Sequence, residues 1–141
     1  MKKFILAFLF FNFLFSFSQK TEKLALRKYK IATLSDSLKE TSGLTFLKDK
    51  LYTLNDGGNT NEIFEIDKNS GKILSKLKIN FPNKDWEAIT SDGKNFYIGD
   101  FGNNAGSRKD LAIYKTDFQG IYSKNSFNYS AQNDLIKKGS F

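Results

Sequence analysis

The sequence lacks histidine and cysteine altogether, and it contains a single proline in 141 residues. Without histidine, the chain cannot supply a Ser-His-Asp or Cys-His catalytic group or a histidine-based zinc site. Without cysteine, it has no disulfide, no thiolate nucleophile and no cysteine for lipid attachment. A metal site in this chain would therefore be built from oxygen ligands, which favour Ca²⁺ or Mg²⁺.

Positive charge exceeds negative charge but is not concentrated. The chain has 22 Lys and Arg against 15 Asp and Glu, a formal net charge of +7. Only Arg27 and Arg108 are arginines, and the lysines occur singly or in pairs. A nucleic-acid surface more often shows clustered basic residues interleaved with aromatics, whereas dispersed lysines keep sheet edges soluble. We therefore expect no nucleic-acid partner.

The N-terminus has the pattern of an export signal. Two lysines follow the initial methionine, residues 4–15 form an apolar run of 12 residues broken by one asparagine, and small serines stand at Ser16 and Ser18. This pattern predicts a signal peptide over residues 1–18 in helical form, cleaved after Ser18, with export to the periplasm, cell surface or medium. The alternative is a membrane anchor, but the run is shorter than the roughly 20 residues that cross a bilayer. We expect no transmembrane span in residues 19–141.

The rest of the chain is self-similar. Segments 40–59 and 85–104 align without a gap at an offset of 45 residues, and residues 63–67 match 113–117 at an offset of 50. The aligned pairs include Leu44/Ile89, Thr45/Thr90, Leu51/Phe96, Tyr52/Tyr97, Gly57/Gly102 and Asn59/Asn104. A repeat of about 45 residues is the length of one β-propeller blade of four strands.

Short segments with period-two alternation and turns rich in Gly, Asn and Asp predict an all-β fold. We expect strands at 43–47, 51–55, 62–67, 72–80, 87–91, 95–100, 111–116 and 126–130, with a separate N-terminal strand at 26–34. These make about two four-stranded antiparallel blades of an incomplete β-propeller, at residues 40–80 and 85–130. Because a closed ring needs at least four blades, we expect an N-terminal fragment of a longer propeller. The alternative is assembly of several copies into one ring.

Five phrases carry a resemblance to a known group of proteins. They are KETSGL at 39–44, LNDGGN at 54–59, KDWEAI at 84–89, YIGDFGNN at 97–104 and RKDLAIY at 108–114. As a set they resemble a largely uncharacterised group of exported bacterial β-propeller proteins. They are similar in pattern to six-bladed propellers of the SdiA-regulated and phytase-associated esterase-like types. The resemblance implies a ring about twice the length of this chain.

Polar residues at the predicted inner strand ends are candidates for ligand or metal binding. They are Asn55, Asp56, Asp85, Glu87, Asp100, Asn103 and Asn104. Carboxylates and amides at a channel mouth can hold Ca²⁺ through oxygen. The alternative is that Asp and Asn beside glycine stabilise their own turns. Trp86 either stacks on a ligand ring or belongs to the blade core.

Three functions follow from these observations. The first is an exported, non-catalytic propeller module that binds an unidentified ligand, glycan or protein, and the lack of a complete catalytic group favours it. The second, in a full-length form, is a Ca²⁺-dependent lactonase-like, esterase-like or phosphoesterase-like hydrolase with Glu87 and Asp100 as ligands. The third is a truncated remnant without activity. Enzymatic activity stays open at this stage.

Overall fold

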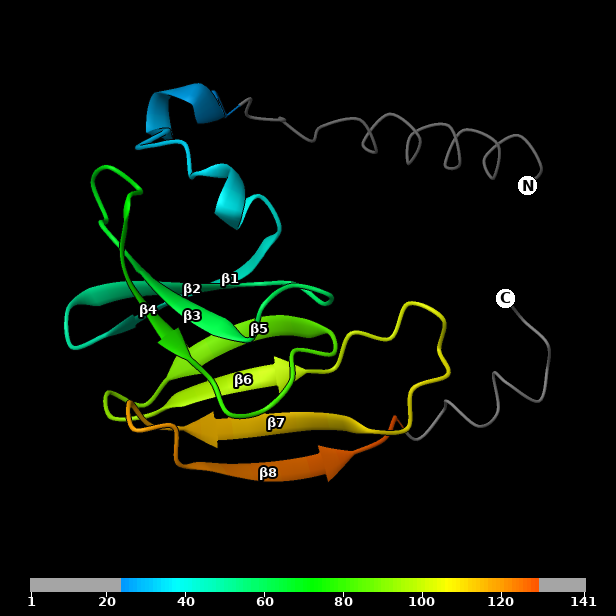
Figure 1. Cartoon of the computed structure of the whole chain (residues 1–141). Coiled ribbons are helices and arrows are strands. Elements are labelled where there is room, and N and C mark those ends of the chain that lie inside the picture. The colour runs from blue at the N-terminus through cyan, green and yellow to red at the C-terminus, as the bar shows by residue number, and fades with distance from the viewer. Residues whose placement is uncertain (1–23, 130–141) are drawn as a thin grey trace, which may run out of the picture. The chain divides into compact units, whose positions relative to one another are not determined.

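The computed structural model describes residues 24–129, and the predicted signal peptide at 1–18 lies outside them. The described part is all-β, as expected, with two four-stranded antiparallel sheets and two short 3₁₀ turns (Figure 1). Among the described residues, no helix has the length and apolar character needed to cross a membrane.

Each sheet is a meander in which consecutive strands pair. The first sheet contains β1 (Thr41–Leu47), β2 (Lys50–Asn55), β3 (Glu62–Ile66) and β4 (Ile73–Lys78); the second contains β5 (Trp86–Ser91), β6 (Phe96–Asp100), β7 (Leu111–Thr116) and β8 (Tyr122–Phe127). All eight strands lie where the sequence predicts strands, except that β8 begins at Tyr122 instead of residue 126. The order is the same in both sheets, and each strand pairs with the strand that follows it in the chain.

The first strand of each sheet carries a β-bulge at the same relative position. In β1 the register shifts between Thr41 and Gly43, and in β5 it shifts between Trp86 and Ala88. The two bulges are 45 residues apart, which is the offset found in the sequence. A bulge redirects the side chain of its extra residue, and in β5 that residue is Glu87.

Alternation and register divide each sheet into two faces, because cross-strand partners share a face. We define the leading face of the first sheet by Leu44, Phe46, Leu51 and Phe64, and that of the second sheet by Ile89, Phe96, Ile98 and Tyr114. We define the trailing face of the first sheet by Gly43, Tyr52, Leu54 and Ile63, and that of the second sheet by Ala88, Tyr97, Gly99 and Ile113.

The trailing face of the first sheet packs on the leading face of the second. One core cluster contains residues of both faces, including Leu54, Ile63 and Ile98, none of which has exposed surface. Strand β1 lies beside β5, since Ser42 Oγ donates a hydrogen bond to the Trp86 carbonyl at 2.8 Å. Contact between these strands is close: a Cβ on Gly43 would lie 2.9 Å from the backbone nitrogen of Ile89.

The N-terminal strand predicted at 26–34 is not formed. Residues Leu26–Tyr29 make a 3₁₀ turn (η1), and the chain up to residue 34 has no regular structure. An isolated segment becomes a strand only when a neighbouring edge accepts its hydrogen bonds, and neither described sheet pairs with this segment. A second 3₁₀ turn, Asp36–Leu38 (η2), buries Leu38 with Phe64 on the leading face of the first sheet.

Candidate functional site

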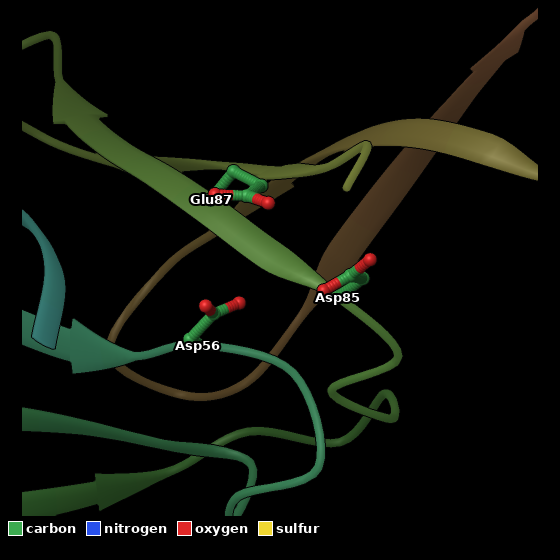
Figure 2. Close-up of side chains that lie close together, drawn as sticks. All are labelled: Asp56, Asp85 and Glu87. Atoms are coloured by element: carbon green, nitrogen blue, oxygen red, sulfur yellow. The ribbon is translucent and has the colours of Figure 1, made fainter. Parts of the chain in front are cut away.

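Three carboxylates from different parts of the sequence meet where the two sheets adjoin. Asp56 follows β2, Asp85 precedes β5, and Glu87 lies at the bulge of β5. Oxygen atoms of all three lie within 4.8 Å of one another, and each residue is partly buried (Figure 2). The first sheet therefore contributes one carboxylate, and the second sheet contributes two.

Backbone contacts hold Asp56 and Asp85 in these positions. The Asp56 amide donates to the Glu40 carbonyl at 2.9 Å, which ties the end of β2 to the start of β1. The side-chain amide of Asn83 donates to the carbonyls of Asn55 and Asp56, at 3.0 and 2.9 Å. Because Asn83 belongs to the segment between the sheets, it fixes the approach to Asp85 against the end of β2.

Two glycines leave room for the carboxylate of Asp85. A Cβ on Gly57 would lie 2.5 Å from Asp85 Oδ1, and a Cβ on Gly102 would lie 2.3 Å from Asp85 Oδ2. The same Cβ on Gly102 would be 2.6 Å from Glu87 Oε1. These glycines are aligned partners in the sequence comparison, and the structure shows that any side chain at either position would enter the carboxylate group.

The carboxylates repel one another. Burial raises the pKa of Asp85, and the neighbouring charge of Asp56 raises it further, against the opposing effect of Arg108. Burial also raises the pKa of Glu87, with added repulsion from Asp56 and Asp85. Arg108 lies at the edge of this group, with its Nη1 4.0 Å from Asp85 Oδ2. A bound cation would relieve this repulsion.

Asp100 lies beside this group but has a different partner. It is 1% exposed, and its Oδ1 accepts hydrogen bonds from Arg108 Nη2 at 2.8 Å and from the Asp85 amide at 3.1 Å. Of the predicted ligand pair, the structure therefore groups Glu87 with Asp56 and Asp85, whereas Asp100 forms an ion pair with Arg108. A guanidinium suits this role because its several donors reach Asp100, the Gly102 carbonyl and Asp110 at the same time.

Arg108 is the residue that the sequence reasoning missed as a functional position. It also donates to the Gly102 carbonyl at 2.8 Å and to Asp110 Oδ1 at 3.2 Å. Hydrogen bonds from Lys84 and then from Arg108 lower the pKa of Asp110 to about 2. The available signal was that Arg108 is one of only two arginines and follows the loop after Asp100.

Two of the three remaining predicted asparagines, Asn55 and Asn103, have structural contacts. Asn55 is buried, and its side-chain amide donates to the Ser37 carbonyl at 2.8 Å. Asn103 Oδ1 accepts the Arg108 amide at 2.8 Å within its own loop, which is the predicted turn role, and Asn104 is exposed.

Trp86 belongs to the core and has no surface on which a ligand could stack. It is 0% exposed, its Nε1 donates to the Pro82 carbonyl at 3.2 Å, and its ring centroid is 5.6 Å from that of Phe81. Of the two alternatives for Trp86, the structure therefore supports the place in the core. Trp86 begins the bulged strand β5, and its indole lies in the core cluster that residues of both sheets form.

No protein-family model matches this chain, and no curated protein is significantly similar to it.

Proposed function

We propose that the two sheets are neighbouring blades of an exported β-propeller that acts as a non-catalytic binding module, and that this module holds Ca²⁺ between the blades. The ion is bound by Asp56, Asp85 and Glu87. The observation that carries the proposal is the convergence of carboxylates from both sheets within 4.8 Å.

The packing of the sheets supports the propeller interpretation. Each sheet has four strands in meander order, and β1 and β5 lie side by side as the first strands of their sheets. Propellers place their blades in this way around a central axis, with the first strand of each blade innermost. The end of β2 and the start of β5 then lie at one mouth of the axis, where Asp56 and Asp85 are found.

The chemistry of the carboxylate group supports Ca²⁺ as the ligand. Ca²⁺ prefers carboxylate and carbonyl oxygens in flexible geometry with six to eight ligands. Three carboxylates supply part of this shell, and the positions left over are available to water or to an oxygen of a bound partner. Because both sheets contribute carboxylates, a bound ion would also link the two sheets.

The small number of protein carboxylates in the group favours hydrolysis as a second candidate. A Ca²⁺ ion with free positions can polarise an ester, lactone or phosphoester oxygen or activate water. Calcium-dependent turnover of such a substrate that is lost in Glu87→Gln would replace the non-catalytic proposal with this one.

The experiment is a calorimetric titration of the purified full chain with CaCl₂ after chelation, together with thermal unfolding. We expect a single site with a dissociation constant of about 10⁻⁴–10⁻³ M, as in extracellular calcium modules. A Ca²⁺ concentration 100 times the dissociation constant should stabilise the fold by about 2.7 kcal/mol. Binding should weaken at acid pH, since the raised pKa values of Asp85 and Glu87 make protons better competitors.

Substitutions distinguish calcium binding at this group from a nonspecific effect of surface carboxylates. Glu87→Gln and Asp56→Asn should each remove the calcium heat and the calcium-induced rise in Tm. The matched control is Glu62→Gln on β3, a partly exposed carboxylate paired with Lys76 and outside the group, which should bind Ca²⁺ like the wild type. A folded wild-type protein that shows neither heat nor a Tm shift with Ca²⁺ overturns the proposal.

A further inference from the structure

We infer that the leading face of the first sheet binds the trailing face of the second sheet of another copy of this chain, so that copies associate head to tail. The starting observation is an uncovered apolar surface. Leu44 and Phe46 on β1 are each 57% exposed, and with Ile31 and Leu51 they line an apolar groove of about 440 Å³. Contiguous exposed apolar surface of this kind marks an interaction site.

The contact inside the chain shows what this leading face fits. Leu44 aligns with Ile89 at the offset of 45, and Ile89 is only 6% exposed because the trailing face of the first sheet covers it. Leu51 aligns with Phe96, which is 0% exposed and packs edge-on against Tyr52 at 4.9 Å between ring centroids. The first sheet thus presents outward the kind of residue that the second sheet buries.

The trailing face of the second sheet repeats the composition of the surface that already binds a leading face. Its aligned residues Thr90, Tyr97 and Ile113 are identical to Thr45, Tyr52 and Ile63 of the first sheet. Ile113 remains 40% exposed, although the residue that aligns with it, Ile63, is completely buried. The second copy is therefore the occupant with the matching surface.

The largest difference in residue size between the two trailing faces is compensated by another side chain of the same chain. Gly99 aligns with the buried Leu54 and has no side chain of its own. The ring of Phe101 occupies that space instead, since a Cβ on Gly99 would lie 2.0 Å from Phe101 Cε1. An apolar group therefore stands at the same place on both trailing faces.

One position makes the contact between copies looser than the contact within the chain. Gly43 allows β1 to approach β5 closely, but the second sheet carries Ala88 at the aligned position. The methyl group of Ala88 would meet the β1 backbone of the next copy, and the interface must open by a few tenths of an ångström. The association is consequently weaker than the packing of the two sheets and depends on concentration.

The two faces are different surfaces, so the contact is heterologous. Repetition of such a contact closes into a ring when the rotation between copies allows it, and otherwise extends into a filament. Propellers contain about four to eight blades. With two sheets per copy, as in residues 24–129, a closed ring would contain about two to four copies.

The experiment is sedimentation and light scattering of the full chain from about 1 to 200 µM, where weak self-association becomes visible. Wild-type protein should form oligomers as concentration rises. Phe46→Glu and Ile113→Glu should each weaken association by about tenfold or more, since each places a charge in an apolar interface. Ala88→Gly should strengthen it. The control is Ile121→Glu, at a position 72% exposed in the turn between β7 and β8, which should not change it.

A mixing experiment tests the head-to-tail arrangement and also shows that the variants are folded. Phe46→Glu keeps an intact trailing face, and Ile113→Glu keeps an intact leading face, so an equimolar mixture should give a 1:1 dimer. A dimer formed by either variant alone indicates a symmetric contact and overturns the inference, as does a wild-type protein that stays monomeric. Chelation of Ca²⁺ should leave association unchanged, because these surfaces do not include the carboxylate group.

Discussion

The leading faces of the two sheets are built from aligned residues but lie in opposite environments. On the second sheet, Ile89 and Phe96 are buried under the first sheet. On the first sheet, their aligned partners Leu44 and Leu51 border an open groove, and only part of that face is covered by Leu38 and its neighbours. The same pattern of alternation therefore yields a core in one sheet and a surface in the other, depending on what packs against it.

The ends of the second strands differ as well. In the first sheet, β2 ends with the neutral Asn55 followed by the acidic Asp56; in the second, β6 ends with the acidic Asp100 followed by the apolar Phe101. Arg108 is required only where the buried residue is charged. The comparison teaches that one backbone plan can place an open carboxylate at one sheet end and a closed ion pair at the next.

The largest expected effect tests the two leading faces directly. Ile89→Ala should lower the free energy of unfolding by about 3 kcal/mol, because it leaves a cavity in the shared core. Leu44→Ala, at the aligned position, should lower it by less than about 0.5 kcal/mol, because the side chain is mostly in water. Urea unfolding at low protein concentration measures both values. Equal losses would mean that the leading face of the first sheet is covered in solution.

A smaller effect is expected at the ends of the second strands. Arg108→Gln should lower the free energy of unfolding by about 2 kcal/mol, because the buried carboxylate of Asp100 loses a cation that is itself partly exposed. Adding Asp100→Asn gives the second sheet the amide that Asn55 supplies in the first, and most of the loss should be recovered. Chemical denaturation of the two single variants and the double variant measures the coupling. If the losses of the two single variants simply add up in the double variant, the ion pair with Asp100 does not explain the role of Arg108.

The smallest effect concerns pH and the carboxylate group. The raised pKa of Asp85 means that the folded protein binds a proton at this residue more tightly than the unfolded chain does. The stability that this proton contributes is therefore lost as pH rises above the ordinary Asp value of 3.8 and through the raised native pKa. Asp85→Asn should therefore stabilise the calcium-free protein by about 0.5 kcal/mol at neutral pH. This gain should shrink as pH falls back through the raised native pKa.

The aligned carboxylate of the first sheet is the control for this prediction. Glu40 is exposed at the start of the first sheet, where its Oε2 accepts a hydrogen bond from Asn59 at 2.7 Å. Glu40→Gln should change the Tm of the calcium-free protein little at any pH. If both variants respond alike to pH, repulsion within the carboxylate group is not the cause.

Local pattern was enough to predict most strands, because alternation and the glycine-rich and Asp-rich turns act within a few residues. It was not enough for the segment at 26–34, whose apolar residues suggest a strand although no described edge pairs with it. Among the site residues, Asp56, Asp85 and Glu87 were candidates from the sequence, but their grouping required the contact between β2 and β5. The role of Arg108 was not predicted, because nothing in the local pattern ties it to a residue eight positions away.

The sequence by itself determined the all-β class, the two sets of four strands, the exclusion of histidine and cysteine chemistry, and the glycines at 57 and 102. Only the tertiary structure decided which carboxylates are neighbours, that Trp86 is core, and that Leu44 and Phe46 remain exposed. The physical reason is range: strands and turns depend on steric and hydrogen-bonding preferences of adjacent residues, whereas charge clusters and burial depend on which faces come together.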